Sequence, residues 1–206
     1  SLASSLNMDC GFMNLNSADP NIGQGGAINI AGGPATISDT TFEANDAGGG
    51  GGALNLVLGA TITNSSFLAN VAPFGPGGAI RSPLGTLNST DNTFRNNSTT
   101  VNGGAIFAST LVSNTDVFET NTARSAGGAI ALDAPGTGQM QLFDGLLGGN
   151  TVGEGGLSFS GQGGALEFRG IIGLIEDTQF LNNTAPESGD GIGLGGASYN
   201  AATLEL

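Results

Sequence analysis

The tripeptide Gly-Gly-Ala occurs seven times in this 206-residue chain, beginning at Gly25, Gly51, Gly77, Gly103, Gly127, Gly163 and Gly195. Successive copies lie 26, 26, 26, 24, 36 and 32 residues apart, and nearly every interval holds a second motif, Phe-x-x-Asn, at a fixed place. A recurring period of this length indicates stacked structural repeats, not independent globular domains. We therefore predict one elongated domain over residues 1–206.

Each repeat contains two short strand signals. Residues 27–30 and 53–56 alternate apolar and polar side chains after the glycines, and residues 36–42 form a second strand signal before the Asn. Helical periodicity is absent, and 38 glycines would destabilise helices. The pattern predicts an all-β parallel β-helix, or β-solenoid, of about seven coils with ~25 residues each. We expect a half coil at 1–24, six full coils over 25–194 and a half coil at 195–206.

Stacked coils would turn each repeat position into a ladder of like residues along the solenoid axis. One ladder is large and apolar and should face inward: Met13, Phe42, Phe67, Phe94, Phe118, Leu147 and Phe180. Three residues further on lies a ladder of amides that can bond the coils above and below: Asn16, Asn45, Asn70, Asn97, Asn121, Asn150 and Asn183. The glycine pairs should form a corner that needs unusual backbone angles and leaves no room for side chains.

The composition narrows the possible chemistry. The net charge is −13, with 17 acids, four arginines, no lysine and no histidine. Nucleic acids and anionic membranes need a positive surface, and no apolar stretch approaches the ~20 residues of a spanning helix. Without histidine or lysine, and with Cys10 alone, Ser-His-Asp and Cys-His catalysis and His or multi-Cys zinc sites are excluded. The adjacent carboxylates Glu176 and Asp177 should point to opposite faces of a strand, so we expect no enzyme.

Another repeat position, three residues before the apolar ladder, is rich in carboxylates: Asp39, Asn64, Asp91, Asp144 and Asp177. Oxygen ligands suit Ca²⁺, which makes Asp39, Asp91, Asp144 and Asp177 weak calcium candidates. The alternative, which we favour, is that these side chains cap a turn, and we expect no bound cofactor. Cys10 is expected to be a free thiol, with an intermolecular bridge as the alternative.

The last two full coils are longer than the others, and much of the excess lies at residues 151–162 and 184–194. Extra residues in a solenoid concentrate in loops on one edge, which often form its binding face. The two segments are therefore either a binding site, for a glycan or for calcium, or tolerated insertions.

The pairing of Gly-Gly-Ala-Ile or Gly-Gly-Ala-Leu with Phe-x-x-Asn resembles the repeat of the chlamydial polymorphic membrane proteins and related bacterial surface proteins. Gly-Gly-Ala-Ile occurs at Gly25, Gly77, Gly103 and Gly127, Gly-Gly-Ala-Leu at Gly51 and Gly163, and Phe-x-x-Asn at Phe42, Phe67, Phe94, Phe118 and Phe180. The resemblance implies a right-handed β-helix in the secreted passenger region of an adhesin. The chain departs from the pattern at Leu147 and at Ser198.

The sequence thus predicts an extracellular or cell-surface β-helix with a structural or adhesive role. Residues 1–24 resemble the second half of a coil and 195–206 the first half, so copies joined end to end could form a surface fibre. An adhesin passenger with a host-surface or glycan ligand, or a glycan- or calcium-binding module using loops 151–162 and 184–194, is the alternative. A polysaccharide-degrading enzyme on the same fold is a third possibility.

Overall fold

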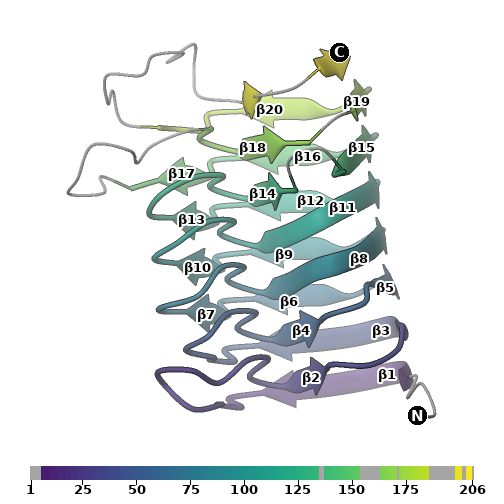
Figure 1. The fold of residues 1–206 in the computed structure, drawn as a ribbon, viewed down its shortest axis with the longest axis vertical. Helices are drawn as coiled ribbons and strands as arrows, with labels where there is room; N and C mark the ends of the chain where they lie inside the picture. The colour runs from purple at the N-terminus through teal and green to yellow at the C-terminus, as the bar shows by residue number, and fades with distance from the viewer. Residues whose placement is uncertain are drawn as a thin grey trace.

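The structure is a computed structural model that describes residues 6–134, 137–153, 163–170, 172–185, 198–200 and 203–205. All regular elements within these ranges are β-strands, and every strand pairing is parallel (Figure 1). The chain winds upward as a solenoid in which each coil lies over the preceding one. The predicted all-β solenoid is therefore confirmed. Residues 6–134, the longest uninterrupted stretch, make about five turns, fewer than the seven coils predicted for the whole chain.

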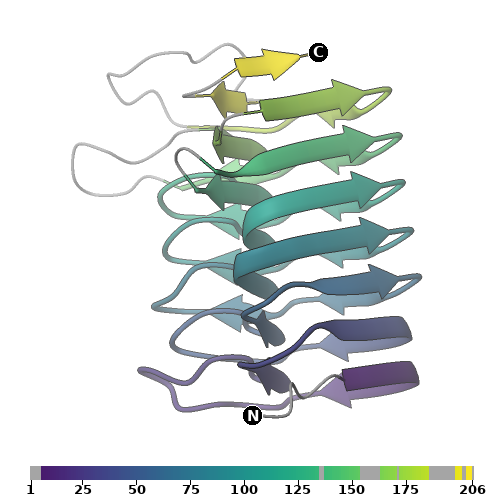
Figure 2. The ribbon, with the colours of Figure 1, turned by 45° about the vertical axis from the view of Figure 1, so that its right-hand side comes forward.

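Three columns of strands form the walls of the solenoid (Figure 2). The first column contains β2 (Ile28–Ile30), β4 (Leu54–Leu56), the starts of β8 (Ile80–Thr90) and β11 (Ile106–Asn114), β14 (Ile130–Asp133), β18 (Leu166–Arg169) and β21 (Ser198–Asn200). The second contains the starts of β1 (Leu6–Asn14) and β3 (Ala35–Glu43), β5 (Ala60–Thr63), the ends of β8 and β11, β15 (Gln139–Phe143), β19 (Ile172–Glu176) and β22 (Thr203–Glu205).

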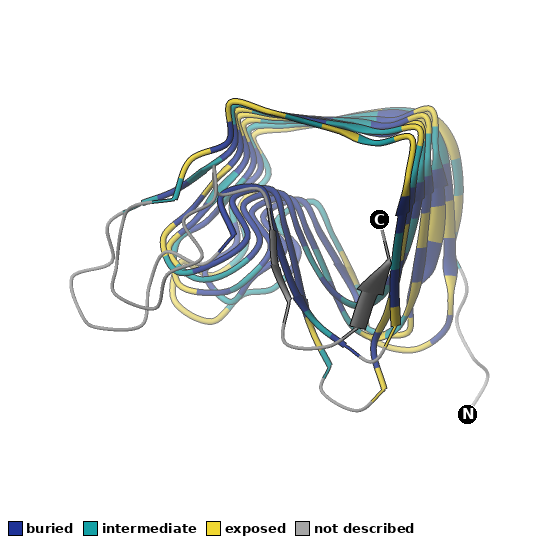
Figure 3. Ribbon diagram, turned by 90° about the horizontal axis from the view of Figure 1, so that it is seen from above, coloured by how far each residue is buried: buried dark blue, intermediate teal, exposed yellow. Residues whose placement is uncertain are grey.

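The third column begins with the ends of β1 and β3. It continues through β6 (Ser66–Leu68), β9 (Thr93–Arg95), β12 (Val117–Glu119), β16 (Leu146–Gly148) and β20 (Gln179–Leu181). A separate small sheet stacks β7 (Val71–Ala72), β10 (Ser98–Thr99), β13 (Thr122–Ala123) and β17 (Thr151–Val152). The turns that link this small sheet to the first column project sideways as a lobe, visible along the solenoid axis in Figure 3. We use the name lobe for residues 17–24, 46–50, 71–76, 98–102 and 122–126.

Three corners of the solenoid are turned by residues with positive φ, and a fourth corner lies between the first and second columns. The corner before the first column uses the first glycine of each pair, for example Gly77 at φ 75°. The corner between the second and third columns is turned by Cys10, Asp39, Asn64, Asp91, Thr115, Asp144 and Asp177. The corner after the third column is turned by Leu15, Ala44, Ala69, Asn96, Thr120, Gly149 and Asn182. Asn and Asp tolerate this left-handed conformation better than most residues, which explains their frequency at the second corner.

The second glycine of each pair meets a different constraint. A Cβ added at Gly78 would lie 2.0 Å from the carbonyl oxygen of Gly104 and 2.6 Å from the amide nitrogen of Ser98. The small sheet therefore packs backbone to backbone against this corner. Any side chain at that position would separate the lobe from the first column.

The interior is a continuous apolar column. Phe42, Phe67, Phe94 and Phe118 are buried and stack ring on ring, with centroids 5.0, 4.8 and 4.7 Å apart. The spacing follows from the distance between strands in a parallel sheet. Met13 and Leu147 hold the same register in their coils, and Phe180 packs against this core while half-buried. Each fully buried ring contributes about 1.5–3 kcal/mol by burial.

Candidate functional site

The Asn ladder lies at the third corner, one residue after the positive-φ position, and its hydrogen bonds repeat from coil to coil. In Asn97, one Nδ2 hydrogen is donated to Phe67 O at 2.9 Å and the other to Asn121 Oδ1 at 3.0 Å. Its Oδ1 accepts the backbone N–H and the Nδ2–H of Asn70, both at 3.0 Å. The same bonds join Asn16, Asn45, Asn70, Asn121, Asn150 and Asn183 into one chain. The ladder therefore satisfies a line of buried amides and is structural.

A second polar ladder, which the sequence analysis missed, runs along the second corner. Thr40, Ser65, Asn92 and Asp116 are buried at this position. The side chains of the last three each accept the backbone N–H of their counterpart in the preceding coil: Thr40 N to Ser65 Oγ at 3.1 Å, Ser65 N to Asn92 Oδ1 at 2.8 Å and Asn92 N to Asp116 Oδ1 at 2.8 Å. The residue types differ, so no repeated letter revealed them. Their constant place, two residues before the Phe ladder, was the available signal.

Asp116 is the charged member of this second ladder. Its Oδ2 accepts a hydrogen bond from Ser113 Oγ at 2.6 Å, and burial raises the pKa of its carboxyl to about 6 despite the hydrogen bonds that favour the charged form. The coil above places Gly145 at the ladder position, so no side chain there can accept the N–H of Asp116. The ladder is interrupted at this step.

The four calcium candidates lie on the exposed second corner. Asp39 accepts a hydrogen bond from Asn64 Nδ2, and Asp91 accepts one from Thr115 Oγ1. In these coils a hydrogen-bond donor, Asn64 or Thr115, thus lies next to each aspartate in the column. The repulsion between carboxylates is therefore smaller, and a cation is not needed to relieve it. Asp144 and Asp177 hold adjacent levels of the same column, with Asp144 N bonded to Glu176 O at 3.2 Å.

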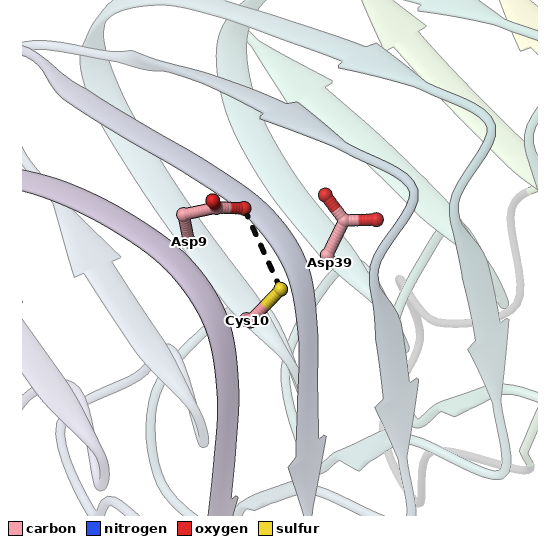
Figure 4. Close-up of side chains that lie close together, drawn as sticks. All are labelled: Asp9, Cys10 and Asp39. Carbon is pink, nitrogen blue, oxygen red and sulfur yellow. Dashed lines mark hydrogen bonds between the residues drawn. The ribbon is translucent and has the colours of Figure 1, made fainter.

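One cluster of possible ligand atoms forms at the amino-terminal end of this corner, and it includes a residue that the sequence analysis did not select. Asp9, Cys10 and Asp39 place carboxylate oxygens and the thiol sulfur within 4.8 Å of one another (Figure 4). All three are exposed, and Asp9 Oδ1 already accepts a hydrogen bond from Ser38 Oγ at 2.8 Å. The predicted register of the incomplete first repeat could have placed Asp9 there. Two carboxylates and a sulfur do not form the oxygen-rich shell that calcium prefers.

The Cys10 side chain is a free, exposed thiol in the structure. The charge of Asp9 raises the pKa of this thiol, with smaller contributions from burial and from Asp39. Because the thiolate is the reactive form, the nearby carboxylates make Cys10 less reactive at neutral pH than an ordinary exposed cysteine.

A buried carboxylate also lies on the outer side of the first column. Glu167 is fully buried and forms an ion pair with Arg169, with 2.8 Å between Oε1 and Nη2. Burial raises the pKa of Glu167 to about 7; Arg169 opposes the shift, and Asp133 on the adjacent strand adds to it. In earlier coils the same face carries linked polar side chains, in which the N–H of Arg81 Nη1 donates a hydrogen bond to Asn55 Oδ1 at 2.9 Å.

The two long segments predicted as a binding face, 151–162 and 184–194, lie outside the described residues except for 151–153 and 184–185. The described part contains no helix long and apolar enough to cross a membrane. Several large apolar side chains are exposed on the solenoid: Phe12, Leu15, Ile22, Leu58, Phe74, Leu84, Ile172 and Leu181.

Comparison with known proteins gives one match. The family model of the Chlamydia polymorphic membrane protein repeat matches residues 93–109. This stretch runs from β9 through the Asn corner and the lobe to the glycine corner and the start of β11, so it includes one complete pair of the two motifs. The match confirms the resemblance drawn from the motifs. No curated protein matches the chain. No solved structure matches it either.

Proposed function

We propose that the protein is a non-catalytic, structural and adhesive β-solenoid of the cell surface, similar in role to a secreted passenger region. The observation that supports this best is the matched repeat, because residues 93–109 form one level of a solenoid whose neighbouring levels repeat the same corners and ladders. A surface protein of this kind displays side chains along a stiff rod. The buried ladders provide the stiffness, and the outward positions are left to vary.

The exposed apolar side chains of the lobe are the proposed contact surface. Ile22 is 79% exposed and Phe74 65% exposed, and both lie on turns of the lobe. Between them lie the three glycines at residues 48–50 of the second coil; Gly49 N is bonded to Gly23 O at 2.6 Å and Phe74 N to Gly48 O at 3.2 Å. The two side chains therefore flank a strip of bare backbone. Aromatic and large aliphatic residues are the types that anchor protein contacts.

Adhesion can be tested with beads that carry the purified chain, applied to cultured epithelial cells. We expect the beads to be retained, and retention to fall when Ile22 and Phe74 are both replaced by Ser. The matched control replaces Leu58 and Leu84, an exposed pair at the corner between the first and second columns, with Ser. Retention no greater than that of uncoated beads would contradict the adhesive role. Equal losses of retention in both variants would show that the lobe is not the contact surface.

End-to-end association into fibres is the second part of the proposal. The edge of β1 opposite β3 has no strand pairing within the described residues, and Met8, Met13 and Ile28 pack against the core while only half-buried. A further coil from another copy would cover these side chains and pair the edge. Electron microscopy and sedimentation over a concentration series test this: fibres are expected, and a monomer at the highest concentration would exclude fibre formation.

A further inference from the structure

The peptide bond between Asp19 and Pro20 lies in the lobe of the first coil, and it is the only Asp–Pro bond among the seven prolines of the sequence. Both residues are exposed. An Asp–Pro bond is unusually susceptible to breakage because the neighbouring carboxylate can attack the carbonyl carbon and the tertiary proline nitrogen is a good leaving group once protonated. Attack within one residue closes a five-membered ring, which makes the step intramolecular.

The structure places hydrogen-bond donors on the reacting groups. The carbonyl oxygen of Asp19 accepts the backbone N–H of Gly23 at 3.0 Å and, more weakly, that of Gly48 at 3.3 Å. Donors on a carbonyl oxygen stabilise the negative charge that develops there when the carbon is attacked. The carboxylate is also held, because its Oδ1 accepts the N–H of Asn21 at 2.9 Å and that of Ile22 at 3.0 Å.

The second donor depends on close contact between two coils. A Cβ added at Gly48 would lie 2.3 Å from the carbonyl oxygen of Pro20 and 2.6 Å from the amide nitrogen of Asn21. Only glycine lets the second coil approach this closely, so Gly48 brings its N–H to the Asp19 carbonyl. The lobes of the following coils contain no Asp–Pro bond; the third coil has Ala72 before Pro73 instead.

We propose that the Asp19–Pro20 bond is a self-cleavage site that the folded lobe activates in acid. A carboxylate oxygen of Asp19 attacks the carbonyl carbon of the same residue, and the bond to Pro20 breaks. Its electron pair leaves with the proline nitrogen, which takes up a proton from the acidic solution. The product is a cyclic anhydride at Asp19, and one water molecule opens it to leave two carboxyl groups. The net reaction is the hydrolysis of one peptide bond, with no oxidation or reduction.

The same hydrogen bonds set the pH range. The N–H groups of Asn21 and then Ile22 lower the pKa of the Asp19 carboxyl, and burial opposes this slightly. The attacking carboxylate therefore persists at a lower pH, where protons for the leaving nitrogen are more abundant. In the adjacent segment of the lobe, residues 46–50, the titratable side chain is that of Asp46, whose carbonyl oxygen accepts the N–H of Ala18. The shift at Asp19 comes from the two N–H groups and burial, not from the charge of Asp46.

Cleavage would not by itself separate the two products. Residues 1–19 include β1, which pairs with β3 over eight registered positions, and Asn16, whose side chain is bonded to Asn45 Oδ1 at 2.8 Å. The cut chain would thus keep its first coil through non-covalent contacts. It would also gain a new amino terminus at Pro20 on the exposed lobe.

The test is mass spectrometry of the purified chain during incubation over a pH series, with and without strong denaturant. We expect fragments of residues 1–19 and 20–206, formed about tenfold faster from the folded chain than from the denatured one. This rate ratio is smaller than the acceleration that an enclosed oxyanion hole provides, because the Asp19–Pro20 bond is exposed to water. The Asp19→Asn variant should not be cut, and Ala72–Pro73 should remain intact.

The Gly48→Ala variant tests the contribution of the fold. Its rate in native buffer should fall toward the rate in denaturant, whereas Gly32→Ala, where a Cβ would meet nothing within 4 Å, should be cut as fast as the original chain. Circular dichroism checks that both variants are folded. Equal rates for folded and denatured chains, or cleavage at other bonds at a comparable rate, would overturn the proposal.

Discussion

Replacing Asn97 with Ala should strongly destabilise the solenoid, because the side chain makes four hydrogen bonds inside a ladder. It donates to Phe67 O and Asn121 Oδ1 and accepts two bonds from Asn70. At about 0.5–1.5 kcal/mol for each bond, the loss is about 2–6 kcal/mol. The upper half of that range is favoured because the substitution leaves donors of Asn70 buried without an acceptor.

The free energy of unfolding can be measured by urea titration followed by far-ultraviolet circular dichroism. Asn96→Ala is a matched control: Asn96 is the adjacent residue, it is exposed, and the earlier coils have Ala44 and Ala69 at its position. The control should cost about 1 kcal/mol, from the left-handed backbone of the new alanine and the loss of one exposed hydrogen bond, which Thr120 Oγ1 donates to Asn96 Oδ1 at 2.6 Å. A cost for Asn97→Ala no larger than that of Asn96→Ala would refute the view that the amide ladder holds the coils together.

Three other outcomes follow from the polar groups of the second corner. Gly145→Ser should stabilise the chain by about 0.5–2 kcal/mol in the same titration, because the hydroxyl can accept the N–H of Asp116. The added Cβ would lie 3.2 Å from the carbonyl oxygen of Asp116, a tight contact that a small backbone shift must relieve, so a loss of stability would show that the backbone cannot make this shift. Burial raises the pKa of Asp116 from 3.8 to about 6, so the folded state binds the proton more tightly, and stability should increase by about 2 kcal/mol as the pH falls from about 7 to about 4. Asp116→Asn should remove that part of the pH dependence, and an unchanged pH profile would contradict the assignment. Asp9→Asn should make Cys10 react several-fold faster with a thiol reagent near neutral pH, whereas Asp91→Asn, another exposed acid, should leave the rate unchanged.

The sequence predicted those features of the fold that repeat the same residue type. Phe67 and Phe94 recur at the same place in the period, and their stacking follows from the register that the period imposes. Gly77 and Gly78 were predicted to form a corner that needs unusual backbone angles and has no room for side chains. In the structure each glycine meets one of these needs: Gly77 has a positive φ, and Gly78 lies in close contact with neighbouring backbone. A residue type that recurs in every coil is a strong signal, because the side chain at that position has the same packing environment in each coil.

Features built from different residue types were not predictable in the same way. Ser65, Asn92 and Asp116 perform one task, accepting a backbone N–H from the coil below, which any small acceptor can do. No single residue type was therefore selected at that position. The cluster of Asp9 with Cys10 and the donors on the Asp19 carbonyl depend on contacts between an incomplete first repeat and the second coil, which the spacing of the motifs does not fix.

Acidification should affect this chain differently from most proteins. With no lysine or histidine and only four arginines, lowering the pH removes negative charge and creates almost no positive charge. The buried carboxyls of Asp116 and Glu167 both have raised pKa values, so their protonation favours the folded state over the same range. The solenoid should thus become more stable where the Asp19–Pro20 bond becomes reactive. The N–H donors to the Asp19 carbonyl are in place only in the folded lobe. A chain that stays folded in acid therefore keeps the accelerated cleavage, whereas a chain that unfolded first would lose it.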